Sequence, residues 1–413
     1  MKVLLVHNFY RSAVPSGENA VFAAEEALLR SRGHDVETLT CNSDELTARG
    51  VLGCIQGAAA VPWNPWMARS IRRAVDRFRP DVVHVHNTFP MISPAIFGAV
   101  GKKAARVLTL HNYRLFCSAA IPMRDGRVCT QCIDRRTPWP ALQHGCYRGS
   151  RVATLPIALS IGLHRALGTW KNNVDAFIAL SNFQRTLMAA SGLPAGRVHV
   201  KPNFFPGNPD VVPWSSREPY VIFAGRLSSE KGLITLLKAW RAWGVPAPEL
   251  RLVGDGDLRN QLEAMAVGLP VRFLGPLNAV DTQAQIARAR LLVLPSEWFE
   301  GFPMVIREAF AFGTPVAVSR IGPLPTIVQT GRSGIVFPSN NPEALGEEVR
   351  RSWEEPGLLE RLGHGARGEF EAKYTEEVNH AILMSIYDKA LEGPRHDLDA
   401  RRHERTTMDV IGG

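Results

Sequence analysis

The chain lacks an uninterrupted apolar stretch long enough to cross a membrane. Its most apolar long segment, residues 152–170, is broken by a proline, a histidine and an arginine, whereas a membrane-spanning helix needs roughly 18 apolar residues in a row. The first ten residues, MKVLLVHNFY, lack the basic start and long apolar core of a secretory signal, because His7 and Asn8 interrupt the apolar run. They predict a first β-strand and a protein without a transmembrane helix.

Nucleic-acid-binding motifs are also absent, since no zinc-finger spacing, helix-turn-helix pattern or aromatic RNP-like box stands out. The charge is nevertheless uneven. Residues 1–205 carry 25 Lys and Arg against 12 Asp and Glu, although the net charge of all 413 residues is +9. A basic half without a nucleic-acid motif favours a phosphate-bearing acceptor or an anionic membrane surface as its partner. The length favours two or three domains.

Short apolar runs alternate with amphipathic helical segments along nearly the whole chain. The runs are KVLLVHN, DVVHVHN, RVLTLHN and AFIALSN in the first half, and YVIFAGR, ELRLVGDG, VRFLG, LLVLPS and TPVAVSR in the second. Strands that alternate with helices predict parallel sheets of the α/β class. Most runs end in a polar residue or glycine, at the edge where such sheets bind ligands.

A segment rich in Pro, Asn and Ser, residues 200–219, has no periodicity and separates the two series of runs. We therefore predict two Rossmann-like, doubly wound parallel-sheet domains, residues 1–205 and 206–375, that face each other across a cleft. Residues 376–392 are expected to form a helix that packs back on the first domain. The polar residues 393–413 are expected to be a disordered tail.

The stretch SEWFEGFPMVIREAFAFGTPV carries two carboxylates, Glu300 and Glu308, around a Gly-Phe-Pro turn. Pro303 suits the first position of a helix. With a rise of ~1.5 Å per residue, Glu308 lies about 7 Å along the axis from Pro303, so both carboxylates can line one cleft at the helix N-terminus. Because this end of a helix attracts anions, the pattern indicates a ligand with hydroxyl groups and phosphate. Two solvated surface glutamates are the alternative.

Two cations follow another predicted strand in FAGRLSSEKG, where Arg226 comes directly after the strand and Lys231 five residues later. Together they fit a diphosphate, because Arg can contact two oxygens while Lys acts as a point charge. A solvated pair explains the same letters. The nearby VGDGD lacks the third glycine of a dinucleotide fingerprint, and a tight turn explains its two aspartates better than a metal site does.

In the first half, His111 ends a predicted strand in LTLHNYR, where a structural hydrogen bond is the alternative to a catalytic role. Ser16 and Gly17 precede a helix, so their backbone N–H groups can meet a phosphate. His84 and His86 alternate along a strand and are therefore expected to point to opposite faces, which excludes a shared metal ion. His86 is expected at the rim of the sheet and His84 in the core.

In combination, FAGRLSSEKG, LVGDG, FLGPL and PSEWFEGFPMVIREAFAFGTPVAVSRIGPLPTIV resemble the donor-binding half of family 4 glycosyltransferases. These are retaining enzymes of the GT-B fold with a Glu-x7-Glu motif. The similarity extends from HNFYRSAVPSGENAVF to about residue 390. One departure is that the family often has two adjacent glycines where this chain has Ser16 and Gly17.

The resemblance implies a role for each matching residue. Glu308 would hold the ribose of the nucleotide, and Glu300 would lie against the donor sugar together with the backbone of Gly301, Phe302 and Pro303. Arg226 and Lys231 would bind the diphosphate, a loop containing Gly17 would close over it, and His111 would lie near the transferred sugar. Gly254 and Leu274 belong to the matching motifs and are expected to contact the donor.

The resemblance also implies a function. It predicts a hexosyl-type glycosyltransferase that moves a sugar from a UDP- or GDP-sugar to a polysaccharide or lipid-linked glycan, with retention and without a catalytic metal or other cofactor. The protein is expected to be cytoplasmic and peripheral on the inner face of the plasma membrane. The alternatives are a nucleotide-sugar epimerase of GT-B fold, which would lack an acceptor site, and an inactive sugar-nucleotide-binding protein.

Four of the six cysteines lie close together in the sequence: Cys117, Cys129, Cys132 and Cys146. Structural disulfides are not expected in a cytoplasmic enzyme. A C-x-x-C pair with flanking cysteines 12 and 14 residues away is within reach of tetrahedral thiolate coordination. We predict a structural zinc that takes no part in the chemistry. Reduced cysteines in a loop are the alternative, and His144 can replace one thiol as a ligand.

Overall fold

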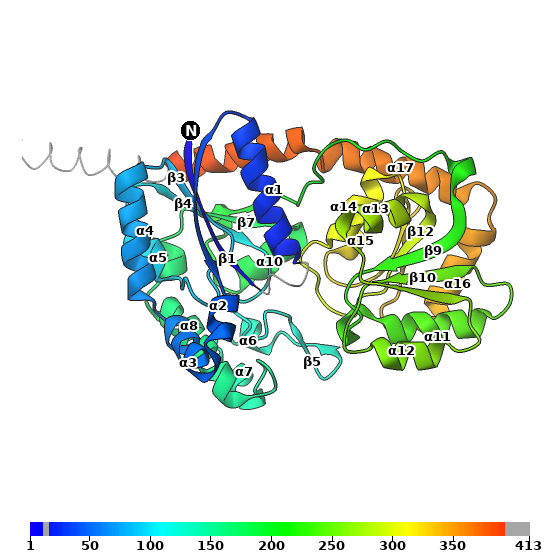
Figure 1. Ribbon diagram of the computed structural model, residues 1–413, viewed down its shortest axis with the longest axis horizontal. Coiled ribbons are helices and arrows are strands. Elements are labelled where there is room, and N and C mark those ends of the chain that lie inside the picture. The colour runs from blue at the N-terminus through cyan, green and yellow to red at the C-terminus, as the bar shows by residue number, and fades with distance from the viewer. Residues whose placement is uncertain (11–15, 393–413) are drawn as a thin grey trace, which may run out of the picture. The chain divides into compact units, whose positions relative to one another are not determined.

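The computed structural model describes residues 1–10 and 16–392 (Figure 1). The chain forms two compact units. Of the described residues, the N-terminal unit contains 1–10, 16–121, 130–201 and 380–392, and the C-terminal unit contains 122–129 and 202–379. Each unit is built on its own six-stranded sheet, so the predicted α/β class with two Rossmann-like parallel sheets is confirmed. The predicted disordered tail lies outside the described residues.

The sheet of the N-terminal unit has the strand order β2-β1-β3-β4-β7-β8, and every pairing in it is parallel. Its strands are β1 Lys2–Phe9, β2 Asp35–Asn42, β3 Val82–Val85, β4 Ala105–Leu110, β7 Ala176–Ala179 and β8 Val198–Val200. The chain moves outward from β1 in one direction to β2 and in the other to β3. This reversal places the ligand-binding switch point of the sheet between β1 and β3.

The helices of this unit follow from local sequence signals. They are α1 Gly17–Ser31, α2 Asp44–Ala48, α3 Gly50–Ala60, α4 Pro65–Phe78, α5 Ala95–Val100, α6 Gln131–Asp134, α7 Trp139–His144, α8 Arg151–Ala166, α9 Thr169–Asn172 and α10 Asn182–Ala190, with a 3-10 turn η1 at Ala195–Arg197. For example, the Asn64 side chain accepts from the backbone N–H groups of Trp66 and Met67, which fixes the start of α4.

The core of the N-terminal unit joins segments from both ends of the chain. Residues 376–392 are helical, and their apolar side chains Leu383, Ile386 and Tyr387 pack in one buried cluster with Val3 of β1 and Phe22 of α1. Each such side chain contributes roughly 1.5–3 kcal/mol when it is removed from water. Residues more than 350 positions apart in the sequence therefore pack together to stabilise the sheet of the N-terminal unit.

The sheet of the C-terminal unit has the order β11-β10-β9-β12-β13-β14 and is also entirely parallel. Its strands are β9 Glu218–Ala224, β10 Glu249–Val253, β11 Val271–Gly275, β12 Ala289–Leu294, β13 Val316–Ser319 and β14 Gly334–Phe337, and a separate hairpin consists of β5 Met123–Arg124 and β6 Arg127–Val128. This is the Rossmann order 3-2-1-4-5-6, with its switch point between β9 and β12.

Helices cover the sheet of the C-terminal unit on both faces. They are α11 Leu233–Trp243, α12 Arg259–Ala266, α13 Ala279–Arg288, α14 Met304–Ala311, α15 Leu324–Ile327, α16 Pro342–Glu354 and α17 Leu358–Lys373, with 3-10 turns η2 Trp214–Ser216 and η3 Ser229–Lys231. Figure 1 shows α11 and α12 on one side of β9 and β10, and α13 and α14 on the other. Because β9 and β12 are parallel neighbours, the residues that follow them emerge at the same edge of the sheet.

Candidate active site

The predicted cation Lys231 and carboxylate Glu300 meet at the switch point of the C-terminal sheet. Lys231 ends the turn η3 after β9, and Glu300 lies in the loop after β12. Nζ of Lys231 donates to Oε1 of Glu300 over 2.7 Å, and Oγ of Ser296 donates to the same oxygen over 2.6 Å. Only 4% of Glu300 is exposed. The geometry fixes a carboxylate oxygen and an ammonium group beside each other where a doubly wound sheet binds ligands.

Glu308 lies on α14, in the element that follows Glu300. Burial raises the pKa of its carboxyl group above the ordinary value, and the neighbouring Arg307 partly opposes that shift. The backbone carbonyl oxygen of Glu308 accepts from the N–H of Phe312, but no described group donates a hydrogen bond to its carboxylate, and the residue is only partly buried. A carboxyl group of this kind is suited to hydrogen bonding with a ligand hydroxyl.

The start of α14 differs by one residue from the sequence prediction. Pro303 was predicted to be the first helical residue, but its ψ of 119° is extended, and it is the residue that precedes the helix. The helix begins at Met304. Phe302 is buried and its ring centroid lies 5.4 Å from that of Tyr374, so packing holds the turn that starts at Gly301.

Arg226, the second predicted cation, points elsewhere. Its guanidinium lies 3.9 Å from Glu230, and 62% of its side chain is exposed. Lys231 by contrast contacts Glu300. The two cations therefore face different carboxylates, and the exposed arginine is the one with freedom to approach a ligand.

Glycines allow the strand ends of the C-terminal sheet to approach closely. A Cβ on Gly254 would lie 2.0 Å from the carbonyl oxygen of Gly225, and one on Gly232 would lie 2.0 Å from that of Pro295. Gly254 also has a φ of +128°. Only glycine fits at both positions, so these residues bring the ends of β9, β10 and β12 together. Leu274, another predicted contact, is a partly buried residue of β11.

In the N-terminal unit, His111 follows β4 and His86 follows β3. Nε2 of His111 lies 3.0 Å from Nδ1 of His86, and the two rings are stacked with their centroids 5.2 Å apart. Burial and neighbouring histidines hold the pKa of His111 well below its ordinary value. Burial likewise lowers the pKa of His86 to about 4. Both rings are therefore neutral near pH 7.

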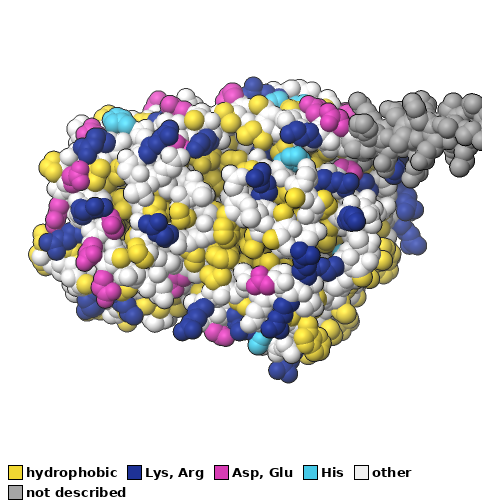
Figure 2. All heavy atoms as spheres, turned by 180° about the vertical axis from the view of Figure 1, so that it is seen from behind, with side chains coloured by type: hydrophobic (Ala, Val, Ile, Leu, Met, Phe, Trp, Pro, Cys, Tyr) yellow, Lys and Arg dark blue, Asp and Glu magenta, His cyan; other side chains and the backbone are white. Residues whose placement is uncertain are grey.

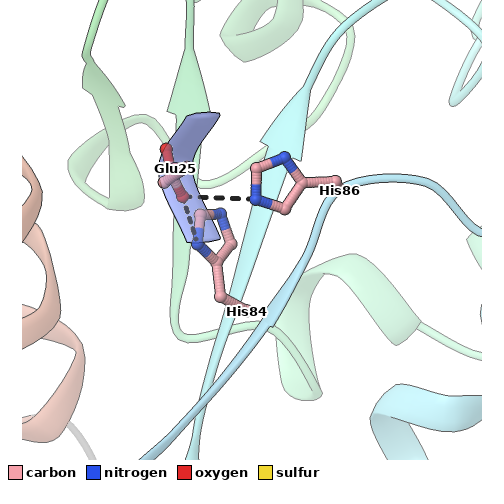
Figure 3. Close-up of side chains that lie close together, drawn as sticks. All are labelled: Glu25, His84 and His86. Carbon is pink, nitrogen blue, oxygen red and sulfur yellow. Dashed lines mark ion pairs between the residues drawn. The ribbon is translucent and has the colours of Figure 1, made fainter. Parts of the chain in front are cut away.

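Behind these histidines lies a buried group of polar side chains that the sequence prediction missed. Oε1 of Glu25 lies 3.0 Å from Nδ1 of His84 and 3.2 Å from Nε2 of His86 (Figure 3). Nζ of Lys201 donates to the other carboxylate oxygen over 2.7 Å. A sequence signal did exist, because Glu25 falls in the apolar stripe of α1 that Val21 and Leu28 also form.

The expectation that His84 and His86 point to opposite faces is wrong. Both rings contact the same carboxylate oxygen, and their centroids are 4.4 Å apart. The physical reason is that β3 ends at Val85, so the strand alternation no longer applies to His86. Glu25, His84 and His86 have ligand atoms within 4.8 Å of one another, and the geometric exclusion of a shared ion therefore fails.

Gly17 is the first residue of α1, with Ser16 preceding it in an extended conformation. Residues 11–15 of the predicted phosphate loop lie outside the described residues. Glu18 follows, and its carboxylate accepts from the side chain of Asn112 over 2.7 Å and from that of Asn87 over 3.2 Å. The start of α1 is thus tied to the loops after β3 and β4, next to His111.

A pocket of the N-terminal unit opens beside His111. Its polar lining includes His86, Thr88, Arg114 and Ser160. Its apolar lining consists of Val61, Phe89, Pro90, Pro94, Leu108, Leu110, Leu115, Ile157, Ile161 and Trp170. The guanidinium of Arg114 lies 4.1 Å from the ring centroid of Phe89. The pocket therefore combines an apolar wall with one cation and several hydrogen-bonding groups.

None of the four clustered cysteines forms a disulfide. Burial raises the pKa of the Cys117 thiol to about 12, with smaller contributions from Cys132 and Cys146. These three thiols all belong to the N-terminal unit. Among the described residues, Glu25, His84 and His86 form the one group of three potential metal ligands within 4.8 Å of one another, so the three thiols are farther apart than that. Cys129 belongs to the other unit. The zinc site stays a prediction.

Comparison with known proteins covers both units. Residues 18–206 match the family model described as Glycosyltransferase Family 4, and residues 206–369 match the one described as Glycosyl transferases group 1. A D-inositol 3-phosphate glycosyltransferase of Streptomyces bingchenggensis is 37% identical over 42% of this chain and 41% of its own. Sulfoquinovosyl transferase SQD2 of Arabidopsis thaliana is 24% identical over 80% of this chain and 61% of its own. The chain thus spans about half the length of these relatives.

Solved structures share the fold over nearly the whole chain. A glycosyltransferase from Rickettsia africae has a TM-score of 0.66 at 14% identity, with 94% of this chain and 99% of that chain covered. HepE of Anabaena in complex with UDP has a TM-score of 0.63 at 17% identity, with 94% and 100% covered. The family matches make both units similar to glycosyltransferases, and the solved structures show that the chain has the GT-B fold. Within residues 1–10 and 16–392, no helix is long and apolar enough to cross a membrane.

Proposed function

We propose that the chain transfers a hexosyl group from a nucleoside diphosphate sugar to a hydroxyl group of a glycan or lipid-linked acceptor, with retention of configuration. The observation that carries the proposal is the Lys231–Glu300 pair at the switch point of the C-terminal sheet. HepE of Anabaena, which has the same fold, has been solved with UDP and with UDP-glucose. This supports a nucleotide sugar as the donor, and we propose a UDP- or GDP-sugar.

The proposed donor roles follow the chemistry of each side chain. Arg226 and Lys231 bind the diphosphate and stabilise the negative charge that grows on it as the bond to the sugar breaks, which makes a catalytic metal ion unnecessary. Glu300 contacts the sugar hydroxyls together with the backbone of residues 301–303. Glu308 binds the ribose hydroxyls, while Gly254 and Leu274 contact the donor.

When the donor binds, its diphosphate would take the place of the Glu300 carboxylate as the anion in contact with Nζ of Lys231. The lysine side chain is 16% exposed and sits beside a nearly buried Glu300. A phosphate oxygen that approaches Nζ releases Glu300 Oε1 to accept from a sugar hydroxyl, while the Ser296 hydroxyl continues to hold this carboxylate in place. The ion pair therefore preorganises both groups before the donor arrives.

The acceptor is proposed to bind in the N-terminal unit, in the pocket beside His111. An apolar wall with Arg114 and several hydroxyl and imidazole groups suits an amphiphilic acceptor that carries a phosphate. Gly17, at the start of α1, belongs to the proposed phosphate loop. The positive charge of the N-terminal half would then attract the phosphate group of the acceptor.

We also propose that the N-terminal unit docks reversibly on an anionic membrane. Apolar side chains are exposed along α3 and α8, with 77% of Val51, 71% of Leu52 and 82% of Val152 accessible to solvent. Helix α4 exposes four arginines, Arg69, Arg72, Arg73 and Arg77. On the rear face in Figure 2, Lys and Arg side chains are interspersed with apolar and acidic ones. Apolar insertion combined with basic side chains is the chemistry of a peripheral membrane surface.

The docking proposal is tested by sedimentation with vesicles. The protein should co-sediment with vesicles that contain anionic lipid at low salt. Added salt should release it, because charges are screened over ~10 Å at 0.1 M. Leu52→Ser/Val152→Ser should weaken sedimentation even at low salt. Binding that is equal on neutral and anionic vesicles would contradict the proposal.

A structural zinc held by the four clustered cysteines is proposed as a separate feature that staples the segment after His111. Metal analysis of protein purified without a metal-affinity tag should give about one zinc per chain, with Zn–S distances near ~2.3 Å by X-ray absorption. Less than a tenth of an equivalent, together with four freely titratable thiols, would rule the site out.

The transfer reaction is tested with radiolabelled UDP- and GDP-sugars, incubated with the protein in the presence and absence of membrane extract. Label that moves into a lipid or polysaccharide fraction is the expected result. An epimerised donor without transfer would favour the epimerase alternative, and an unchanged donor would favour an inactive binding protein.

A further inference from the structure

Glu25 and Lys201 form a fully buried ion pair behind the strand ends of the N-terminal unit. Glu25 is 0% exposed and Lys201 1% exposed, and their charged groups are 2.7 Å apart. Burial alone would raise the pKa of Glu25, but the charge of Lys201 and contacts with His84 and His86 hold it well below the ordinary value. Glu25 is therefore a carboxylate at neutral pH and can only accept hydrogen bonds.

The carboxylate faces His86 through Nε2. Oε1 of Glu25 and Nε2 of His86 are 3.2 Å apart, and neither buried atom has a well-aligned hydrogen-bond partner among residues 1–10 and 16–392. An unprotonated ring nitrogen at that distance would bring a lone pair against a negative charge inside the protein. The charge of Glu25 therefore favours the form of His86 that carries its proton on Nε2.

The same reasoning extends to His111. A neutral imidazole has one donor nitrogen and one acceptor nitrogen, so a proton on Nε2 of His86 leaves Nδ1 of that ring as an acceptor. Nε2 of His111 lies 3.0 Å from this acceptor and must donate to it. Nδ1 of His111 is then unprotonated, and it takes no hydrogen bond from any residue that the structure describes.

We infer that Glu25 is a positioning residue that acts through His86 to hold His111 as the Nε2-protonated tautomer, so that Nδ1 of His111 accepts a hydrogen bond from a substrate hydroxyl group. The pocket beside His111 gives such a group access to the ring. Naming the hydroxyl as part of a sugar or acceptor rests on the proposed function. The tautomer of His111 itself depends only on the contacts of Glu25 with His86 and of His86 with His111.

The same three-residue group of Glu25, His84 and His86 also has the donor set of a metal site. The charges argue against that use. Lys201 places an ammonium group 2.7 Å from the second oxygen of the carboxylate. A divalent ion at this group would therefore lie next to a buried cation that already neutralises the Glu25 carboxylate. The hydrogen-bond chain to His111 uses the observed charges without this conflict.

Histidine-selective 15N labelling of the full chain tests the inference directly, because the shifts of the two imidazole nitrogens report which one carries the proton. The His111→Asn variant identifies the signals of His111. Wild-type protein should show the proton on Nε2 of His111 at pH 7. A proton on Nδ1 of His111, or a stoichiometric metal ion bound to His84 and His86, would overturn the inference.

The double variant Glu25→Gln/Lys201→Met removes both buried charges and keeps similar side-chain volumes. The His111 signals should move toward a mixture of tautomers, and kcat should fall on the order of 10-fold or more with the KM for donor little changed. An unchanged His111 spectrum in a folded double variant would overturn the inference. Tyr387→Phe is the matched control, because its hydroxyl contacts His84 over 2.8 Å and not His86, and it should leave the His111 signals in place.

If wild-type protein transferred no sugar to any acceptor, the proposed function would fail. The tautomer spectrum would still decide the inference, because it requires no turnover.

Discussion

Each unit places an ion pair near the switch point of its parallel sheet, but the two pairs differ in their access to solvent. In the C-terminal unit, Lys231 and Glu300 stand at the ligand-binding edge with the lysine partly exposed. In the N-terminal unit, Glu25 and Lys201 are sealed behind the edge and reach it only through His86 and His111. Under the proposed function, the first pair would contact the ligand itself, and the second pair would set the protonation state of His111, which contacts it.

The largest expected effect is on stability and would come from removing one partner of the buried Glu25–Lys201 pair. Glu25→Ala leaves the Lys201 ammonium buried without its carboxylate, and should lower the free energy of unfolding by about 3–5 kcal/mol. Chemical denaturation at pH 7 measures this. Glu26→Ala is the matched control, because the neighbouring Glu26 pairs with Arg30 at the surface, where such pairs contribute only about 0.3–0.5 kcal/mol. A loss below about 1 kcal/mol for Glu25→Ala would contradict the comparison.

The Lys231–Glu300 pair should instead affect catalysis. Lys231→Ala removes a positive charge where the leaving diphosphate forms, and should lower kcat by roughly 10²–10³-fold while the protein stays folded. Lys238→Ala, an exposed position on the neighbouring helix α11, should retain full activity. Steady-state transfer assays measure both variants. Full activity of Lys231→Ala at limiting donor would show that the assigned role is wrong.

The sealed histidines also predict how stability responds to pH. The pKa of His86 is about 4 in the folded protein against an ordinary value of 6.5, so the unfolded chain binds more protons between these values. The free energy of unfolding should therefore be highest above pH 6.5. It should decrease as the pH falls toward 4, and protonation of His86 should account for up to about 3 kcal/mol of the decrease. Denaturation at pH 7 and pH 5 measures the change. Stability that increases on acidification would contradict the burial of neutral His86.

A smaller effect is expected at Glu308. The Gln variant keeps the size of the side chain but weakens a hydrogen bond to a ribose hydroxyl, and should raise the KM for donor about 10-fold, as expected for ~1.4 kcal/mol of lost binding. Glu347→Gln, an exposed change on α16, is the control. Equal kinetic constants for Glu308→Gln and the wild type would remove Glu308 from the donor site.

The sequence predicted the fold well where strands are buried and apolar. The central strands β1, β3, β4, β9 and β12 all coincide with predicted runs. Within the two six-stranded sheets, the three strands that were not predicted, β2, β8 and β14, lie at the edges, and the short hairpin of β5 and β6 was not predicted either. The edge strand β2 is half exposed and mixes polar with apolar residues, and β8 has three residues, so neither gives a strong apolar run.

The C-terminal site was predictable because its residues lie in two short motifs, and each motif follows a strand. Glu300, Glu308, Arg226 and Lys231 all lie within a few residues of a strand end or helix start. The N-terminal network was not, because Glu25 and Lys201 are 176 residues apart and only the tertiary fold brings them together. The buried glutamate in the apolar stripe of α1 was the available signal, since a charge at a core position requires a partner.

Calorimetric titration of the full chain with UDP and with GDP tests most directly whether the edge between β9 and β12 is a nucleotide-sugar site. Wild-type protein is predicted to bind at least one of the two nucleotides in a 1:1 complex, and Lys231→Ala and Glu308→Gln should each weaken that binding while Lys238→Ala leaves it unchanged. Absence of binding to both nucleotides, or equal affinity in wild type and Lys231→Ala, would contradict the proposed donor site.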